Sequence, residues 1–155
     1  MTILRNTFAA MLLTIPFVGA RAQAHPLVGR WSMELAVGMR MENGEHTPVM
    51  GTGILVLAAQ GDSLVGTLAI APPEGQPARP PARMAAKLVD GDVIFVVRGQ
   101  SRINQNGEES VVETITTWKL SAKGDALAGS LERQLVEFED ANGGPLPVKG
   151  TRVKA

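Results

Sequence analysis

The chain has 155 residues with 15 basic and 15 acidic side chains, and it contains neither cysteine nor tyrosine. The even charge balance and the lack of any basic run argue against nucleic acid or an anionic membrane surface as a partner. The lack of cysteine excludes a disulfide, a thiolate metal site and a lipid-modified cysteine.

Residues 1–24 have the three parts of a secretory signal peptide. Arg5 supplies the positive charge, and residues 8–20 form an apolar stretch of 13 residues, which is too short to span a bilayer. Ala-Gln-Ala at positions 22–24 fits the small-residue cleavage motif. The sequence therefore predicts a secreted or periplasmic protein.

The mature chain is predicted to be a single domain, residues 25–155, that begins at His25. Removal of Arg5 and Arg21 leaves 13 basic side chains against 15 acidic ones, a net charge of −2. After signal cleavage no membrane association is expected.

Turn-forming residues interrupt the mature chain seven times, and seven turns separate eight strands. Asn-Gly and Asp-Gly pairs tolerate the positive φ angles that tight hairpins require. The turn signals are Asn43-Gly44, Gly61-Asp62, the Pro-rich segment 72–82, Asp90-Gly91, Asn106-Gly107, Lys123-Gly124-Asp125 and Asn142-Gly143.

Between these turns apolar residues recur at every second position, as at Trp31, Met33 and Leu35, which is typical of half-buried antiparallel strands. One segment, 131–141, also fits a helical spacing, but extended structure is favoured there. Eight strands in sequence leave two exposed edges unless the sheet closes. The predicted fold is therefore an all-β, eight-stranded antiparallel up-and-down barrel, whose interior is filled by side chains or holds one small ligand.

An internal repeat supports this architecture. Residues 43–68 and 106–131 align without a gap at an offset of 63, with 11 of 26 pairs identical. The shared residues are turn formers and alternating apolar residues, and they include the glycines Gly66 and Gly129. The chain is therefore expected to be a 4+4 pseudo-repeat, with each glycine allowing a strand to coil sharply. Where the copies differ, Leu55 is replaced by Trp118.

Gly29-Arg30-Trp31 begins the first predicted strand, and Arg152 lies in the last. These residues resemble the lipocalin-like calycin barrels, a superfamily in which G-x-W opens the first strand. The resemblance implies that Trp31 closes one end of the barrel with Arg152 packed across its ring as a cation–π pair. It also agrees with the independent count of eight strands.

The sequence offers little for catalysis. No nucleophile elbow, phosphate-binding loop, dinucleotide fingerprint or HExxH motif occurs. We therefore expect no enzyme activity, no catalytic residue and no cofactor. Only His25 and His46 are weak candidates for a metal site, with copper bound through the free amine and imidazole of His25 as a minor alternative.

The leading functional hypothesis is a non-catalytic barrel that binds a small apolar molecule. The alternative is a structural or protein-interaction module of the cell envelope. The sequence does not indicate an oligomeric state. Candidate lumen residues for the ligand are the apolar ones that alternate inward, namely Met33, Leu35, Leu55, Leu57, Leu68, Phe95, Trp118 and Leu131.

Overall fold

The computed structural model describes residues 24–87, 93–138 and 143–155. Within these ranges the chain forms β-strands and connecting turns, and no helix is long and apolar enough to cross a membrane. The strands are β1 (Gly29–Glu42), β2 (Glu45–Gln60), β3 (Ser63–Ile70), β4 (Ala82–Lys87), β5 (Val93–Gln105), β6 (Glu108–Lys123), β7 (Ala126–Leu135) and β8 (Leu146–Arg152).

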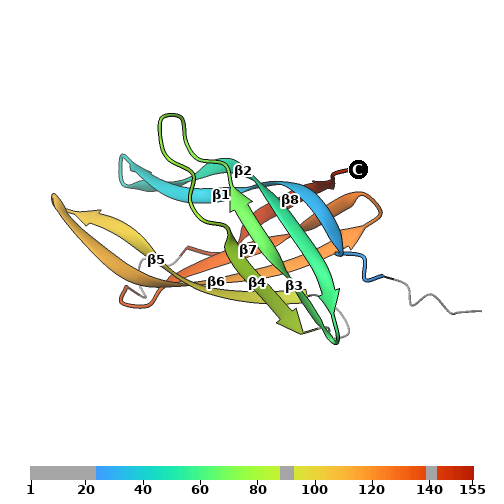
Figure 1. The fold of residues 1–155 in the computed structure, drawn as a ribbon. Helices are drawn as coiled ribbons and strands as arrows, with labels where there is room; N and C mark the ends of the chain where they lie inside the picture. Colours follow the sequence, from blue (N-terminus) through green and yellow to red (C-terminus); the bar gives the residue numbers. More distant parts are fainter. Residues whose placement is uncertain (1–23, 88–92, 139–142) are drawn as a thin grey trace, which may run out of the picture.

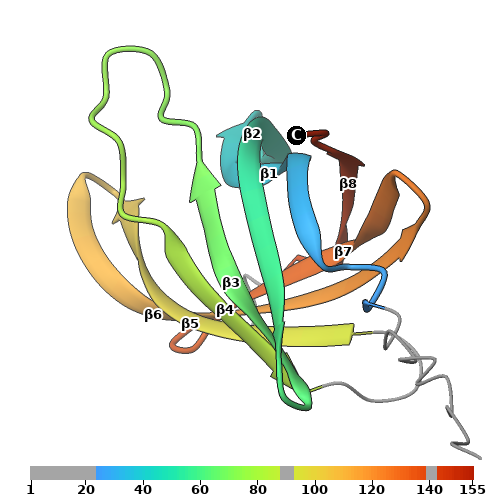
Figure 2. The same ribbon diagram turned by 45° about the vertical axis from the view of Figure 1, so that its right-hand side comes forward.

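All eight strands belong to one antiparallel sheet with the order β4-β3-β2-β1-β8-β7-β6-β5. The sheet curls until its two edge strands, β4 and β5, lie against each other (Figures 1 and 2). This nearly closed, up-and-down barrel confirms the predicted fold class. The structure describes residues 131–138 of the segment 131–141. Most of this part is extended, as predicted, because β7 continues to Leu135.

The barrel has two different ends. Strands β1 and β5 run toward the turns at 43–44 and 106–107, so both long hairpins project from one end, to the left in Figure 1. We call this the hairpin end. The loop at 71–81 leaves β3 at the same end. At the opposite end, which we call the N-terminal end, β1 begins and β8 finishes.

Two of the predicted turns adopt the backbone that Asn-Gly pairs favour. Asn43 and Gly44 have φ angles of 53° and 79°, and Asn106 and Gly107 have 55° and 88°. Positive φ at both central positions matches the twist of the flanking strands. The signals at 61–62, 72–82 and 123–125 also separate strands, whereas Asp90-Gly91 and Asn142 lie outside the described residues.

Replacing Asn106 with alanine is expected to lower the free energy of unfolding by about 1 kcal/mol, because a Cβ-bearing residue without a short polar side chain is strained in this region. Asn106→Gly should change the stability by less than about 0.5 kcal/mol, since glycine adopts positive φ freely. Urea unfolding followed by tryptophan fluorescence measures both. Equal effects of the two substitutions would contradict this explanation.

The core fills the barrel with side chains from alternate positions of every strand. Trp31 and Phe95 are completely buried, and their outward neighbours Arg30 and Val96 are exposed. The buried cluster consists of Leu27, Trp31, Met33, Leu35, Leu55, Leu57, Leu64, Leu68, Met84, Ala86, Val93, Phe95, Trp118, Leu120, Leu127, Leu131 and Val148.

The aligned segments of the internal repeat form equivalent hairpins. Gly66 pairs with Leu57 between β2 and β3, and Gly129 pairs with Leu120 between β6 and β7, at the same offset of 63. A Cβ at Gly66 would lie 1.7 Å from the backbone oxygen of Val56, and one at Gly129 would lie 1.9 Å from that of Lys119. Both glycines are therefore required by a close approach of two backbones. The equivalence of complete four-stranded halves stays a prediction.

Candidate functional site

The N-terminal end of the barrel is closed by Trp31 and Arg152. The guanidinium carbon of Arg152 lies 4.2 Å from the centroid of the Trp31 ring, the arrangement that the calycin resemblance implies. The Trp31 indole donates a hydrogen bond to the carbonyl of Leu27 at 2.9 Å. Arg152 donates to the carbonyls of Val28 and Pro26, each at 2.8 Å. These contacts hold the chain before β1 across the end of the barrel.

His25 belongs to this closure. Its Nδ1 accepts a hydrogen bond from the backbone of Leu27 at 3.2 Å, and its carbonyl accepts one from Val28 at 2.9 Å. His46 lies near the tip of the β1–β2 hairpin, at the opposite end of β1. The two histidines therefore do not meet. Among the described residues no three or more His, Cys, Asp or Glu side chains gather into a group that could hold a metal ion, and copper binding through His25 stays a prediction.

All eight candidate lumen residues lie in the packed core. Each is at most 5% exposed, and they contact one another as members of a single buried cluster. Most of them therefore serve the stability of the barrel. Trp118 and Leu131 differ in position, because the next cross-strand pair toward the hairpin end is polar; beyond it Leu135 and the buried Val112 are apolar again.

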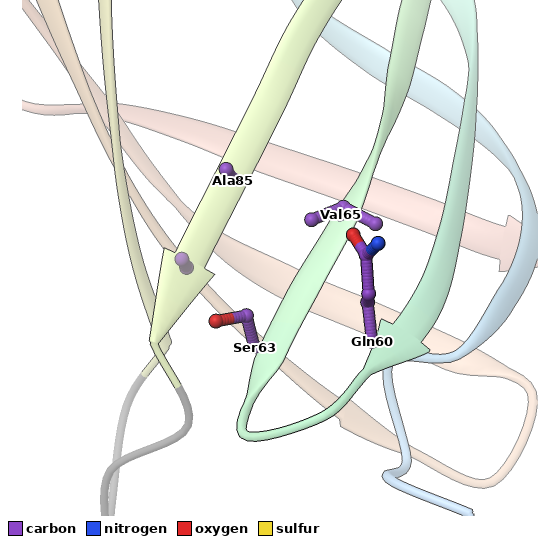
Figure 3. Close-up of a pocket in the computed structure, with 5 residues that line it drawn as sticks. Gln60, Ser63, Val65 and Ala85 are labelled. Atoms are coloured by element: carbon purple, nitrogen blue, oxygen red, sulfur yellow. The ribbon is translucent and has the colours of Figure 1, made fainter.

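Two hollows on the molecule lie away from these residues. The larger, about 350 Å³, is lined by Gln60, Ser63, Val65, Ala85 and Ala86, and Figure 3 shows Ser63 reaching between β3 and β4. The smaller, about 130 Å³, is lined by residues 40 and 47–49 of the β1–β2 hairpin. Both are open to solvent and neither contains a candidate lumen residue. They carry no chemistry that distinguishes them from ordinary surface.

Next to the Trp118–Leu131 pair, the side chains on the inner wall change from apolar to polar. The following pair toward the hairpin end is Thr116 on β6 and Arg133 on β7, and Thr114 follows on β6. Directly opposite residues on one face of a sheet have Cβ atoms about 5 Å apart. Both threonines are buried, and Arg133 is half-buried. Three polar side chains therefore adjoin one another on the inner face.

These three side chains have no partner in the part of the chain that the structure describes. No hydrogen bond or ion pair reaches the hydroxyls of Thr114 and Thr116 or the guanidinium of Arg133. No buried side-chain nitrogen or oxygen without a partner occurs in that part either, so these polar atoms face solvent-accessible space. Burial lowers the pKa of Arg133 from its usual value because the charged form loses hydration.

A glycine, Gly99, lies beside this polar group on the inner face. Gly99 on β5 pairs with Thr114 and is exposed, although it follows Phe95 and Val97 on the inner face. A Cβ built at Gly99 meets only the Thr114 hydroxyl, at 3.5 Å, which is an ordinary contact. The wall therefore lacks a side chain at this position, and a Cβ would fit there without a clash. We call Gly99, Thr114, Thr116 and Arg133 the mouth cluster.

Two members of the mouth cluster, Thr114 and Thr116, lie inside the aligned repeat at positions where the copies differ. At an offset of 63, the cross-strand pair Thr116–Arg133 corresponds to Gly53–Ile70, which also pair across the sheet. Arg133 is not one of the ligand-binding residues predicted from the sequence. Its inward orientation could have been predicted from the sequence, because Arg133 follows Leu127, Gly129 and Leu131 at every second position of one strand.

Comparison with known proteins gives no relative: no protein-family model, curated protein or solved structure matches the chain. The lipocalin-like resemblance therefore stays a prediction.

Proposed function

We propose that the protein is a secreted or periplasmic, non-catalytic barrel that binds a small, largely apolar molecule at its hairpin end. The observation that carries the proposal is the mouth cluster, which combines the missing side chain at Gly99 with polar side chains that have no partner among the described residues. Small-molecule sites are concave and mostly apolar, with a few polar groups that fix the orientation of the ligand.

The rest of the barrel supports this placement. The N-terminal end is closed by Trp31, Arg152 and the residues before β1, and the middle is filled by the core cluster. Toward the hairpin end the buried Trp118–Leu131 pair adjoins the polar pair Thr116 and Arg133. Secretion is supported by the signal-peptide pattern of residues 1–24.

A large side chain at position 99 should weaken binding. We expect Gly99→Leu to weaken the binding of the neutral apolar dye Nile red by about tenfold or more, equivalent to about 1.4 kcal/mol. The leucine side chain would occupy the volume that the ligand uses, and its Cβ meets only an ordinary contact, so the fold should survive. Dye fluorescence measures the affinity, and circular dichroism and urea unfolding check the fold.

The matched control is Gln100→Leu, the next residue of β5, which is exposed on the outer face. This substitution adds the same side chain outside the barrel and should leave dye binding within about twofold of the wild type. Equal binding by both variants and the wild type would place the dye elsewhere and contradict the proposed site.

A second candidate function is a protein-interaction module, favoured by apolar side chains on the outer face of β5. Ile94 is 45% exposed and Val96 is 58% exposed. If the Gly99→Leu variant still binds the dye and the Val96→Asp variant does not, the dye lies on this outer face. That combination would favour the second candidate.

A further inference from the structure

We infer that the projecting part of the β1–β2 hairpin is a site for the soft cation Cu(I), with the thioethers of Met39 and Met41 and the imidazole of His46 as ligands. This metal site lies apart from the mouth cluster, and the inference does not depend on the proposed function.

The methionines that follow the predicted signal peptide fall into two groups. Met33 and Met84 are buried in the core, at 1% and 2% exposure. Met39, Met41 and Met50 belong to the β1–β2 hairpin. Met39 is 49% exposed and Met50 is 56% exposed, so core filling, the usual role of methionine, does not account for them.

Strand register places two of these methionines beside a histidine. Met41 occupies the position opposite His46, and Met39 occupies the position opposite Pro48. Because alternate residues of a strand share a face, Met39 and His46 are diagonal neighbours on one face of the hairpin. Opposite residues have Cβ atoms about 5 Å apart, and diagonal neighbours about 7–8 Å, which is within reach of long side chains. These three positions are therefore close enough to hold a single ion.

The tight turn at the tip fixes this register. Asn43 and Gly44 have φ angles of 53° and 79°, as a two-residue hairpin turn requires. A slip of one residue would move His46 to the face opposite Met39. The turn chemistry therefore keeps the imidazole next to the thioether.

The hairpin that carries these residues is accessible. Strand β8 pairs with β1 only from Trp31 to Glu34, and β3 pairs with β2 only from Gly53 onward, so no described strand covers the edges of the hairpin near its tip. His46 is exposed, and within the part of the chain that the structure describes its imidazole has no hydrogen bond or ion pair. Its ring nitrogens are therefore available to a metal ion.

The donor set indicates which metal the hairpin binds. Thioethers are soft, uncharged ligands that suit Cu(I), whereas Mg²⁺ and Ca²⁺ take oxygen ligands. Zn²⁺ is bound by cysteine, histidine and carboxylate ligands. The chain has no cysteine, and no group of three His, Asp or Glu side chains gathers in the described ranges. Two methionines and one histidine therefore favour Cu(I) over these divalent ions.

Silver nitrate, added to the protein in chloride-free buffer, tests the site, because Ag(I) is soft and monovalent like Cu(I) and is not oxidised by air. We expect Met39→Leu, Met41→Leu and His46→Ala each to weaken Ag(I) binding by about tenfold or more, since each removes one of three ligands. Leucine has nearly the volume of methionine but no sulfur, so the fold should survive. Isothermal titration calorimetry measures the affinity, and circular dichroism checks the fold. The same variants should lose Cu(I) to the chelator bicinchoninate more readily than the wild type.

The matched control is Met50→Leu, which removes an exposed thioether from the same face of the hairpin. Met50 lies four residues from His46 along β2, about 14 Å in an extended strand, which is too far to share one ion. This substitution should leave the Ag(I) affinity within about twofold of the wild type. His25→Ala should do the same, because His25 lies at the N-terminal end of the barrel.

A direct readout is the methyl resonance of each methionine in a carbon-13 spectrum. The methyl signals of Met39 and Met41 should shift on addition of Ag(I), and those of Met33, Met50 and Met84 should stay in place. Each signal is assigned by its loss in the corresponding leucine variant.

Three results would overturn the inference. One is equal Ag(I) affinity in the wild type, Met39→Leu and His46→Ala. Another is an equal loss in Met50→Leu and Met39→Leu, which would mean that exposed methionines bind silver singly. The third is displacement of Ag(I) by an equal concentration of Zn²⁺, which would assign the ion to imidazole and carboxylate groups. None of these results changes the effect of Gly99→Leu on Nile red, so failure of the metal site and failure of the proposed function are distinguishable.

Discussion

Substitution of Gly66 or Gly129 by alanine is expected to lower the free energy of unfolding by about 3 kcal/mol in each case, near the upper range for overpacking. The added methyl group would lie 1.7 Å from the Val56 oxygen or 1.9 Å from the Lys119 oxygen. These oxygens belong to the backbone of the paired strand, so neither can turn aside as a flexible side chain would. Urea unfolding monitored by tryptophan fluorescence measures the loss.

Gly38→Ala is the control for these two substitutions, because nothing lies within 4 Å of a Cβ built at Gly38 and its φ is not positive. It should be neutral or stabilise by about 0.5 kcal/mol, since alanine reduces the entropy of the unfolded chain. The Gly66 and Gly129 variants should also resemble each other, because both glycines occupy the same register in equivalent hairpins. A loss no larger than that of Gly38→Ala would refute the close-approach explanation.

Loss of the Arg152 guanidinium is the second change with a large expected effect. We expect Arg152→Met to destabilise the protein by about 2–3 kcal/mol, because it removes charged donors from the carbonyls of Val28 and Pro26 and the cation over Trp31. Methionine retains an apolar stem of similar length, so most of the packing should survive. Urea unfolding gives the magnitude.

Lys149→Met is the matched control, since Lys149 is an exposed residue of the same strand. It should change stability by less than about 0.5 kcal/mol. A double-mutant cycle of Arg152→Met with Trp31→Phe should give a coupling of about 1 kcal/mol between the two side chains. Additive effects in that cycle would mean that Arg152 acts through its hydrogen bonds and not through the ring.

The fold was largely readable from local chemistry. Asn43-Gly44 and Asn106-Gly107 mark tight hairpins because asparagine and glycine adopt the positive φ that these turns require. The alternation around Trp31 and Phe95 predicted which face is buried, since successive strand residues point to opposite sides. The prediction that Gly66 allows its strand to coil sharply was incomplete. Gly66 serves a close approach of two backbones, a cross-strand distance that no local pattern contains.

The candidate site was less accessible to sequence reasoning. The alternation of apolar residues indicates inward side chains such as Leu55 and Phe95 as a ligand site, and these form the packed core. The mouth cluster was missed because Arg133 resembles an ordinary surface arginine in the sequence. Only its pairing with Thr116, and the lack of a partner among the described residues, set it apart.

The sequence by itself determined the eight-stranded barrel, because turn chemistry and period-two alternation are encoded in neighbouring residues. Tertiary structure decided how the N-terminal end is closed and which polar side chains meet on the inner wall. Arg152 reaches Trp31 and Val28 from more than a hundred residues away, and Gly99 meets Thr114 only across the β5–β6 pairing. Such contacts depend on strand register and barrel curvature, which are set by the packing of the whole sheet.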